Sequence, residues 1–247
     1  MPITPPENAA TATQHTPPHI DAVLFDFGQV LSNAPDAAAW AHLSSIAGVD
    51  KNRLHEAYWA FRHDYDRGVL NGRAYWNAVA RQAGFPLDDA TLAALLAADV
   101  ELWTDLNLPM VEWVARLQRA GIRTGILSNI GDAIAEGIIA KLAWLSAFDH
   151  CTWSHALFMA KPEPAIYLKT AEALNTRPEH ILFIDDREDN IIAAVALGFQ
   201  AIQYTTHAAF EREMRERGFT SLLNVGLDSS IATAAGQPAL EPARTAK

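Results

Sequence analysis

The sequence of 247 residues contains one cysteine, Cys151, so no disulfide can form within the chain. A lone thiol fits a reducing compartment. The sequence also lacks any apolar run long enough to cross a bilayer. Its first residues, MPITPPENAATATQHTPP, have neither the basic nor the apolar region of a secretory signal. These absences predict a cytoplasmic protein with no membrane partner.

Positive charge is also scarce. Nineteen Lys and Arg residues stand against 29 Asp and Glu residues, which gives a formal net charge of −10 at pH 7. Because proteins hold nucleic-acid backbones with clustered Lys and Arg side chains, this balance predicts no nucleic-acid partner. A small anionic substrate remains compatible with the charge, since a pocket needs only one or two local cations and a metal ion.

The bulk composition is that of a globular protein, with 50% hydrophobic and 19% charged residues. The two ends differ from the rest. Residues 1–19 are rich in Pro, Thr and Ala, and residues 227–247 are similarly poor in large apolar side chains. We expect both ends to be flexible tails, because such segments cannot bury enough surface to become ordered.

Short apolar runs alternate with amphipathic stretches between the tails. Four runs have the character of buried strands: AVLF (22–25), TGIL (124–127), ILFI (181–184) and the weaker AIQY (201–204). Most of them follow a helical stretch. This alternation predicts an α/β fold, a doubly wound, Rossmann-like parallel sheet with helices on both faces.

A helical block interrupts this alternation after the first strand. It contains four helical stretches, at 35–48, 51–68, 71–84 and 88–103, which are separated by Gly48, Gly68, Gly84 and Pro86. We therefore predict a core of residues 20–33 and 108–226, with residues 34–107 inserted as a helical cap.

Three apolar runs end at residues that handle phosphate or metal ions. Asp26 ends the first, Ser128 and Asn129 end the second, and Asp185 and Asp186 end the third, while Lys161 precedes a helix marked by two prolines. Taken singly, each is more often a helix cap, a turn residue or a surface charge. Ligands of open parallel sheets, however, bind beyond the carboxyl ends of the strands, so the joint arrangement predicts one site.

The residue types suit phosphoryl transfer. Carboxylates that converge in a cleft repel one another, and Mg²⁺ relieves that repulsion through hard oxygen ligands. A carboxylate nucleophile forms an acyl-phosphate and divides hydrolysis into two easier steps. A lysine ammonium and a hydroxyl group can stabilise the phosphoryl oxygens during the transfer.

Four segments carry a family resemblance. FDFGQVL, ILSNI, AKPEPAIY and FIDDREDN resemble, in this order, motifs I to IV of the haloacid dehalogenase (HAD) superfamily, and the resemblance covers about residues 21–205. The helical block resembles the α-helical cap of subfamily I. Within that group the chain is most similar to phosphatases of the α-D-glucose-1-phosphate phosphatase type and to the phosphatase domain of epoxide hydrolases.

The resemblance implies roles for individual residues. Asp26 would be the nucleophile, and Lys161 and Asp185 would complete the catalytic set. Asp185 would not bind the metal itself but would orient metal-bound water or Lys161. Ser128, the Asn129 amide and Lys161 would hold the phosphoryl group. The ligands of Mg²⁺ would be Asp26, the Gly28 carbonyl and Asp186. Asn190 stands where many relatives carry an acidic residue.

Gly28 departs from the phosphatase pattern, in which the second residue after the nucleophile is an Asp that acts as general acid. The glucose-1-phosphate phosphatase group that the chain resembles also has glycine here. A sugar leaving group at an anomeric carbon needs less protonation than an ordinary alkoxide. Gln29, a metal-bound water or a cap residue could assist instead.

The cap sequence around residues 59–76 concentrates aromatic and basic residues. One interpretation has Tyr65 or Arg67 contacting the non-phosphoryl part of the substrate. The other, which we favour, places Trp59 and Trp76 in the bundle core and the arginines in solvent. Among the histidines only His63 is expected near the site, and the spacing of His150, Cys151 and His155 is too weak to indicate a metal site.

These observations predict an enzyme, a Mg²⁺-dependent phosphatase acting on a small phosphorylated metabolite, with a sugar phosphate favoured, as a monomer or homodimer. One alternative is a 2-haloacid dehalogenase that uses the same Asp26. Such enzymes need no metal, and their motif has Tyr as the second residue after the nucleophile. Another is a catalytically weak binding or regulatory protein of the HAD fold.

Overall fold

The computed structural model describes residues 19–227, and the core of the fold is a parallel sheet of five strands in the order β3-β2-β1-β4-β5. The predicted doubly wound sheet is confirmed. The strands are β1 (Ala22–Phe25), β2 (Arg123–Ser128), β3 (His150–Trp153), β4 (Ile181–Asp185) and β5 (Gln200–Gln203). β3 was not predicted, because its four residues are mostly half-buried and form the edge of the sheet.

Alternation of side chains along β1 produces two separate layers of core. Ala22 and Leu24 pack with α9 and α10 on one face, whereas Val23 and Phe25 join the larger cluster that contains Trp113 on the other. Both faces of the central strands are therefore buried, which explains why the sequences of these strands are unbroken apolar runs.

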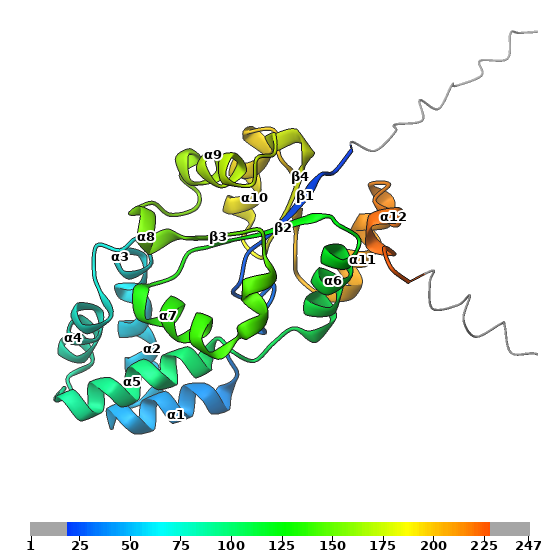
Figure 1. The fold of residues 1–247 in the computed structure, drawn as a ribbon. Helices are drawn as coiled ribbons and strands as arrows, with labels where there is room; N and C mark the ends of the chain where they lie inside the picture. The colour runs from blue at the N-terminus through cyan, green and yellow to red at the C-terminus, as the bar shows by residue number, and fades with distance from the viewer. Residues whose placement is uncertain (1–18, 228–247) are drawn as a thin grey trace, which may run out of the picture.

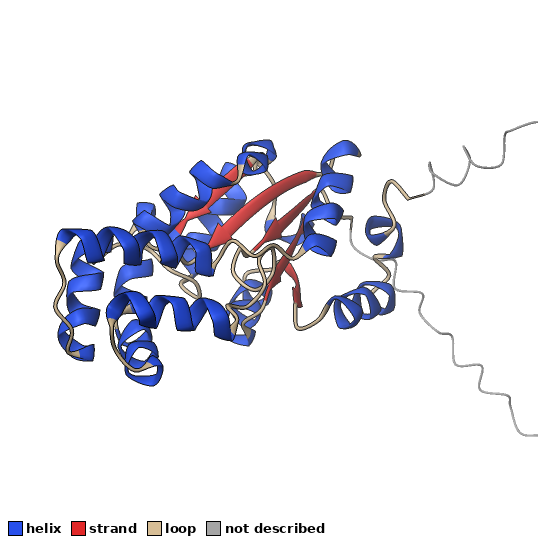
Figure 2. Cartoon of the chain, turned by 90° about the horizontal axis from the view of Figure 1, so that it is seen from below, coloured by secondary structure: helices blue, strands red, loops and turns tan. Residues whose placement is uncertain are grey.

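Helices cover both faces of the sheet (Figure 2). Those of the core are α6 (Leu108–Arg119), α7 (Asp132–Lys141), α8 (Ser154–Leu157), α9 (Pro164–Ala173), α10 (Glu188–Ala196), α11 (His207–Glu216) and α12 (Thr220–Leu223), with 3-10 helices η1 (Ala143–Ala147) and η2 (Pro178–His180).

Five helices between β1 and α6 form a separate group beside the sheet, which we call the cap (Figure 1). They are α1 (Ala37–Ala47), α2 (Lys51–Ala60), α3 (Arg62–Asp66), α4 (Gly72–Ala83) and α5 (Asp89–Leu102). The four predicted helical stretches are present, and the second is interrupted at Phe61. The exact boundaries of core and cap, 33/34 and 107/108, stay predictions.

The two chain segments that join the cap to the core run side by side. Ser32 and Leu106 form an antiparallel bridge, and the Asn107 side chain donates a hydrogen bond to the Val30 carbonyl at 2.8 Å. Within residues 19–227, no helix combines the length and apolarity needed to cross a membrane. The predicted tails lie almost wholly outside the described residues.

Candidate active site

The carboxyl ends of β1, β2 and β4 meet at one edge of the sheet. Phe25 pairs with Ile126 on one side and Ile184 on the other, so the residues that follow these strands emerge at the same level. They open into a cavity of about 470 Å³ between the sheet and the cap. Of the predicted site residues, the cavity is lined by Asp26, Gly28, Ser128, Asn129, Lys161 and Asp186.

Lys161 connects the nucleophile candidate to β4. Its Nζ atom lies 2.6 Å from Asp185 Oδ2 and 3.0 Å from Asp26 Oδ1, in a position where the side chain is 1% exposed. Although burial lowers the pKa of Lys161, the charges of Asp185 and Asp26 outweigh that effect and raise it. Lys161 is therefore a fixed cation next to Asp26.

Asn129 holds the backbone of Lys161. The Asn129 side-chain amide donates to the Lys161 carbonyl at 2.8 Å, and its Oδ1 accepts from the Lys161 N–H, also at 2.8 Å. The side-chain amide of Asn129 is thus engaged in positioning the lysine. Ser128, 3% exposed, lines the cavity beside it.

Asp185 is completely buried and surrounded by donors. Its Oδ1 accepts from the Arg187 N–H at 2.8 Å and from the Asn190 side chain at 2.9 Å, while Oδ2 accepts from Lys161. Asp185 therefore lies where it can orient Lys161, as the resemblance implied. Asn190, which stands in the place of an acidic residue, serves here as a donor to Asp185.

Asp26 and Asp186 remain more available to a ligand. Among residues 19–227, the donors to the Asp26 carboxylate, the Phe27 N–H and Lys161 Nζ, both reach Oδ1, which leaves Oδ2 open. Burial raises the pKa of Asp26 to about 7, against the opposing effect of Lys161 and with added repulsion from Asp185 and Asp186. Burial and the Asp185 charge raise the pKa of Asp186 to about 6.

These carboxylates fit a divalent cation. One oxygen from each of Asp26, Asp185 and Asp186 lies within 4.8 Å of the others. Three carboxylates converge here on one cation, Lys161, so the group has negative charge left to neutralise, and carboxylate oxygens are the ligands that Mg²⁺ prefers. Asp26 and Asp186 would hold the ion, with Asp185 close by.

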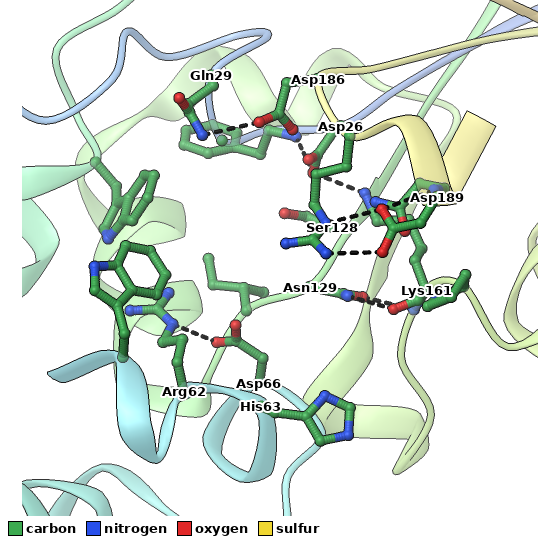
Figure 3. Close-up of a pocket in the computed structure, with 18 residues that line it drawn as sticks. Asp26, Gln29, Arg62, His63, Asp66, Ser128, Asn129, Lys161, Asp186 and Asp189 are labelled. Carbon is green, nitrogen blue, oxygen red and sulfur yellow. Dashed lines mark hydrogen bonds and ion pairs between the residues drawn. The ribbon is translucent and has the colours of Figure 1, made fainter. Parts of the chain in front are cut away.

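Position 28 borders the cap and carries no side chain that could act as a general acid. A Cβ on Gly28 would lie 3.4 Å from the Trp103 ring. The neighbouring Gln29 has a positive φ of 59° and donates through its side chain to Asp186 Oδ2 at 2.8 Å. Gln29 therefore lines the metal end of the cavity (Figure 3).

The predicted substrate contacts Tyr65 and Arg67 do not line the cavity. The Tyr65 ring is fully buried, stacks on Tyr75 at 4.3 Å between ring centroids, and fills the space above Gly131. Arg67 forms an ion pair with Glu163 that joins the cap to the core. His63 does line the cavity, as expected.

The cap residues that line the cavity besides His63 are Trp59, Arg62, Asp66 and Trp103. Arg62, expected in solvent, is only 7% exposed, and Trp59, expected in the bundle core, is 43% exposed. Trp76 is buried as expected. The spacing of Arg62 and Asp66, four residues apart on one helical face, was the available sequence signal for this pair.

Comparison with known proteins identifies a family and several relatives. Residues 20–198 match the family of haloacid dehalogenase-like hydrolases. A phosphoglycolate phosphatase of Xanthomonas campestris is 26% identical over 73% of this chain and 81% of its own length. A drimenol cyclase of Aspergillus calidoustus is 23% identical over 79% of this chain, which spans only 36% of that protein.

Solved structures share the fold. A HAD family enzyme from Bacteroides thetaiotaomicron, in complex with magnesium and inorganic phosphate, superposes with a TM-score of 0.64 at 21% identity, over 76% of this chain and 96% of that one. L-2-haloacid dehalogenase from Xanthobacter autotrophicus gives a TM-score of 0.61 at 19% identity, over 84% and 87% of the two chains.

Proposed function

The chain belongs to the haloacid dehalogenase-like hydrolase family, and from this premise we propose that it is a magnesium-dependent phosphatase of a small phosphorylated metabolite, with a sugar phosphate favoured. Membership confirms the predicted family and the prediction of a hydrolase. The observation that carries the proposal is the meeting of Asp26, Ser128, Lys161 and Asp186 in one cavity.

In the first step, the open Oδ2 of Asp26 bonds to phosphorus while the bond from phosphorus to the leaving oxygen breaks. Lys161 and Ser128 stabilise the phosphoryl oxygens during the transfer, and Asp185 fixes the lysine. A water molecule then attacks the aspartyl-phosphate, releases inorganic phosphate and restores Asp26. When bound to Asp26 and Asp186, Mg²⁺ would supply the charge neutralisation that lets an anionic nucleophile approach an anionic ester.

The test is hydrolysis of p-nitrophenyl phosphate in the presence of Mg²⁺, because this leaving group scarcely needs protonation. Asp26→Asn should abolish turnover while the far-UV circular dichroism spectrum and the melting temperature are retained. Asp64→Asn, which removes a carboxylate outside the cavity, is the matched control and should retain activity. Substantial turnover by the Asp26→Asn variant would contradict a covalent mechanism on this residue.

A dehalogenase remains the second candidate, and the absence of a carboxyl group at Gly28 favours it. An (S)-2-haloacid dehalogenase of a Pseudomonas strain is 29% identical over 35% of this chain. Chelation separates the two functions: EDTA should abolish phosphatase activity, whereas chloride release from a 2-chloroacid by a metal-independent dehalogenase should survive it. The carboxylate cluster supports the phosphatase.

A binding or regulatory protein is the third possibility. It would bind Mg²⁺ and inorganic phosphate without hydrolysing p-nitrophenyl phosphate at any enzyme concentration. The other expectations accompany the proposal as predictions: a cytoplasmic location, no nucleic-acid or membrane partner, and a monomer or homodimer.

A further inference from the structure

The cap side of the cavity is built around one buried ion pair. Arg62 Nε donates to Asp66 Oδ1 at 2.8 Å, and the two side chains are 8% and 14% exposed. Both residues line the cavity, and Figure 3 shows them across it from Asp26 and Asp186. They therefore face the part of a substrate that lies beyond its phosphoryl group.

Two carboxylates offset the positive charge of the Arg62 guanidinium. Besides Asp66, the buried carboxylate of Asp99 lies 3.8 Å away, and Tyr58 bridges the two by donating to Asp99 Oδ1 at 2.7 Å. The rings of Tyr58 and Trp103 lie 5.1 and 5.4 Å from the guanidinium carbon. One cation and two carboxylates give this cluster no net positive charge.

The remaining cations of the cavity are also engaged. Among the described lining residues, Lys161 pairs with Asp26 and Asp185, and Arg187 pairs with Asp189 at 2.7 Å. His63 is the one further basic side chain, and it is exposed. A second anionic group on the substrate would therefore meet paired carboxylates on the cap side, where His63 is the one described basic lining residue outside these ion pairs.

We propose that the Arg62–Asp66 pair selects phosphate monoesters whose leaving group is uncharged and hydroxyl-bearing, and that Asp66 is the residue that disfavours a leaving group with a carboxylate. Carboxylate oxygens accept hydrogen bonds from hydroxyl groups but repel anions. Trp59 and Trp103 supply flat apolar walls beside the pair. This inference rests on the proposed phosphatase function and concerns its substrate class.

The test compares esters that differ only in one terminal group: 2-phosphoglycolate against 2-hydroxyethyl phosphate, and 6-phosphogluconate against sorbitol 6-phosphate. The quantity is the ratio of kcat/KM for the acidic member to kcat/KM for the neutral member. Burial raises the pKa of Asp66 to about 7, so the assay is run at about pH 8, where its carboxylate is ionised. For the wild type, kcat/KM of the acidic ester should be well below that of the neutral ester. This holds for whichever of the two pairs is long enough for its terminal group to reach the cap.

Asp66→Asn should raise that ratio roughly tenfold, because removal of one carboxylate leaves Arg62 opposed by Asp99 alone. The increase should arise mainly from a lower KM for the acidic ester. Asp64→Asn makes the same charge change on the same helix outside the cavity, and should leave the ratio unchanged. Asp66→Glu, which keeps the charge, should preserve the preference for the neutral ester.

An unchanged ratio in Asp66→Asn, or a wild-type preference for the acidic esters, would overturn the inference. Should Asp66→Asn fail to fold, Asp66→Ser supplies a smaller uncharged side chain for the same measurement. Turnover of p-nitrophenyl phosphate is measured in every variant. If it is present while the ratio does not move, the selectivity inference fails and the phosphatase stands; if it is absent from the wild type, the proposed function itself fails.

Discussion

The indole ring of Trp103 lies against Gly28, so that a Cβ on residue 28 would be 3.4 Å from Cζ3 and 3.6 Å from Cε3 of the ring. The ring is anchored, because its Nε1 donates to the Tyr58 hydroxyl at 3.1 Å. A Cβ at these distances would be in van der Waals contact with the ring, so Trp103 borders the space next to position 28.

We expect the rate to depend strongly on the leaving group. Without a carboxyl group at Gly28, an ester with a good leaving group, such as p-nitrophenyl phosphate, should turn over faster than an alkyl phosphate by about 10²- to 10⁴-fold, the factor that general acid catalysis commonly supplies. Measuring kcat across phenyl phosphates of graded phenol pKa gives the slope directly. A flat slope would mean that another group protonates the leaving oxygen.

Gly28→Asp provides the control. The new carboxyl group should not reduce the slope while Trp103 occupies the adjacent space, whereas Gly28→Asp combined with Trp103→Ala should reduce it. The single substitution Trp103→Ala separates the effect of a cavity from the effect of the new carboxylate. A reduced slope in Gly28→Asp alone would contradict the view that Trp103 excludes an acid.

The phosphoryl end of the site could be predicted from the sequence because it depends on strands. An apolar run that is buried on both faces identifies a strand in the sequence. Because the carboxyl ends of parallel strands lie at one edge of the sheet, Asp26, Ser128 and Asp185 are predicted to lie close together. β3 could not be predicted in this way, because its residues are mostly half-buried and give no continuous apolar run.

The cap side of the site could not be predicted in the same way. Neighbouring positions on a helix point about 100° apart, so a choice between Tyr65 and Asp66 requires knowledge of which face meets the core. Gly68 permits the observed docking, since a Cβ there would collide with the backbone of His155. That contact between cap and core has no local signature in the sequence.

Asp186 and Asp185 should respond differently to substitution. Asp185 is already surrounded by protein donors, whereas Asp186 accepts from the Gln29 side chain, so Asp186 is the better ligand for Mg²⁺. Asp186→Asn should raise the Mg²⁺ dissociation constant about tenfold or more, as measured by calorimetry without substrate. Asp185→Asn should chiefly lower kcat through Lys161. A larger change in Mg²⁺ affinity for Asp185→Asn would reverse the assignment.

The metal-free protein should lose stability as the pH rises from about 4 to about 7. Burial, as the largest cause, raises the pKa of Asp26 and Asp66 to about 7 and that of Asp99 and Asp186 to about 6. In this range the folded state binds more protons than the unfolded state, so the free energy of unfolding falls with rising pH.

Thermal unfolding in EDTA at about pH 5 and pH 8 measures this effect, with the higher melting temperature expected at pH 5. Added Mg²⁺ should raise the melting temperature at pH 8 and have little effect at pH 5, because protons then compete for its ligands. The control is Asp26→Asn combined with Asp186→Asn, in which the Mg²⁺ effect should disappear. A melting temperature that rises from pH 5 to pH 8 without metal would contradict these raised pKa values.

Arg67 should behave as a partner of Glu163 and not as a substrate contact. The pair links the end of α3 to the loop after Lys161, and about a third of each side chain is exposed, so its contribution to stability should be only about 0.2–1 kcal/mol. Glu163 also accepts from the Ala160 N–H at 3.1 Å, which places the pair next to the segment that carries the lysine.

A double-mutant cycle tests this role of Arg67. In the cycle of Arg67→Ala, Glu163→Gln and the double variant, the effects on KM and on the free energy of unfolding should be non-additive, because both single substitutions break the same contact. If Arg67 instead bound the substrate directly, Arg67→Ala would raise KM severalfold while Glu163→Gln left it unchanged, and the two effects would add.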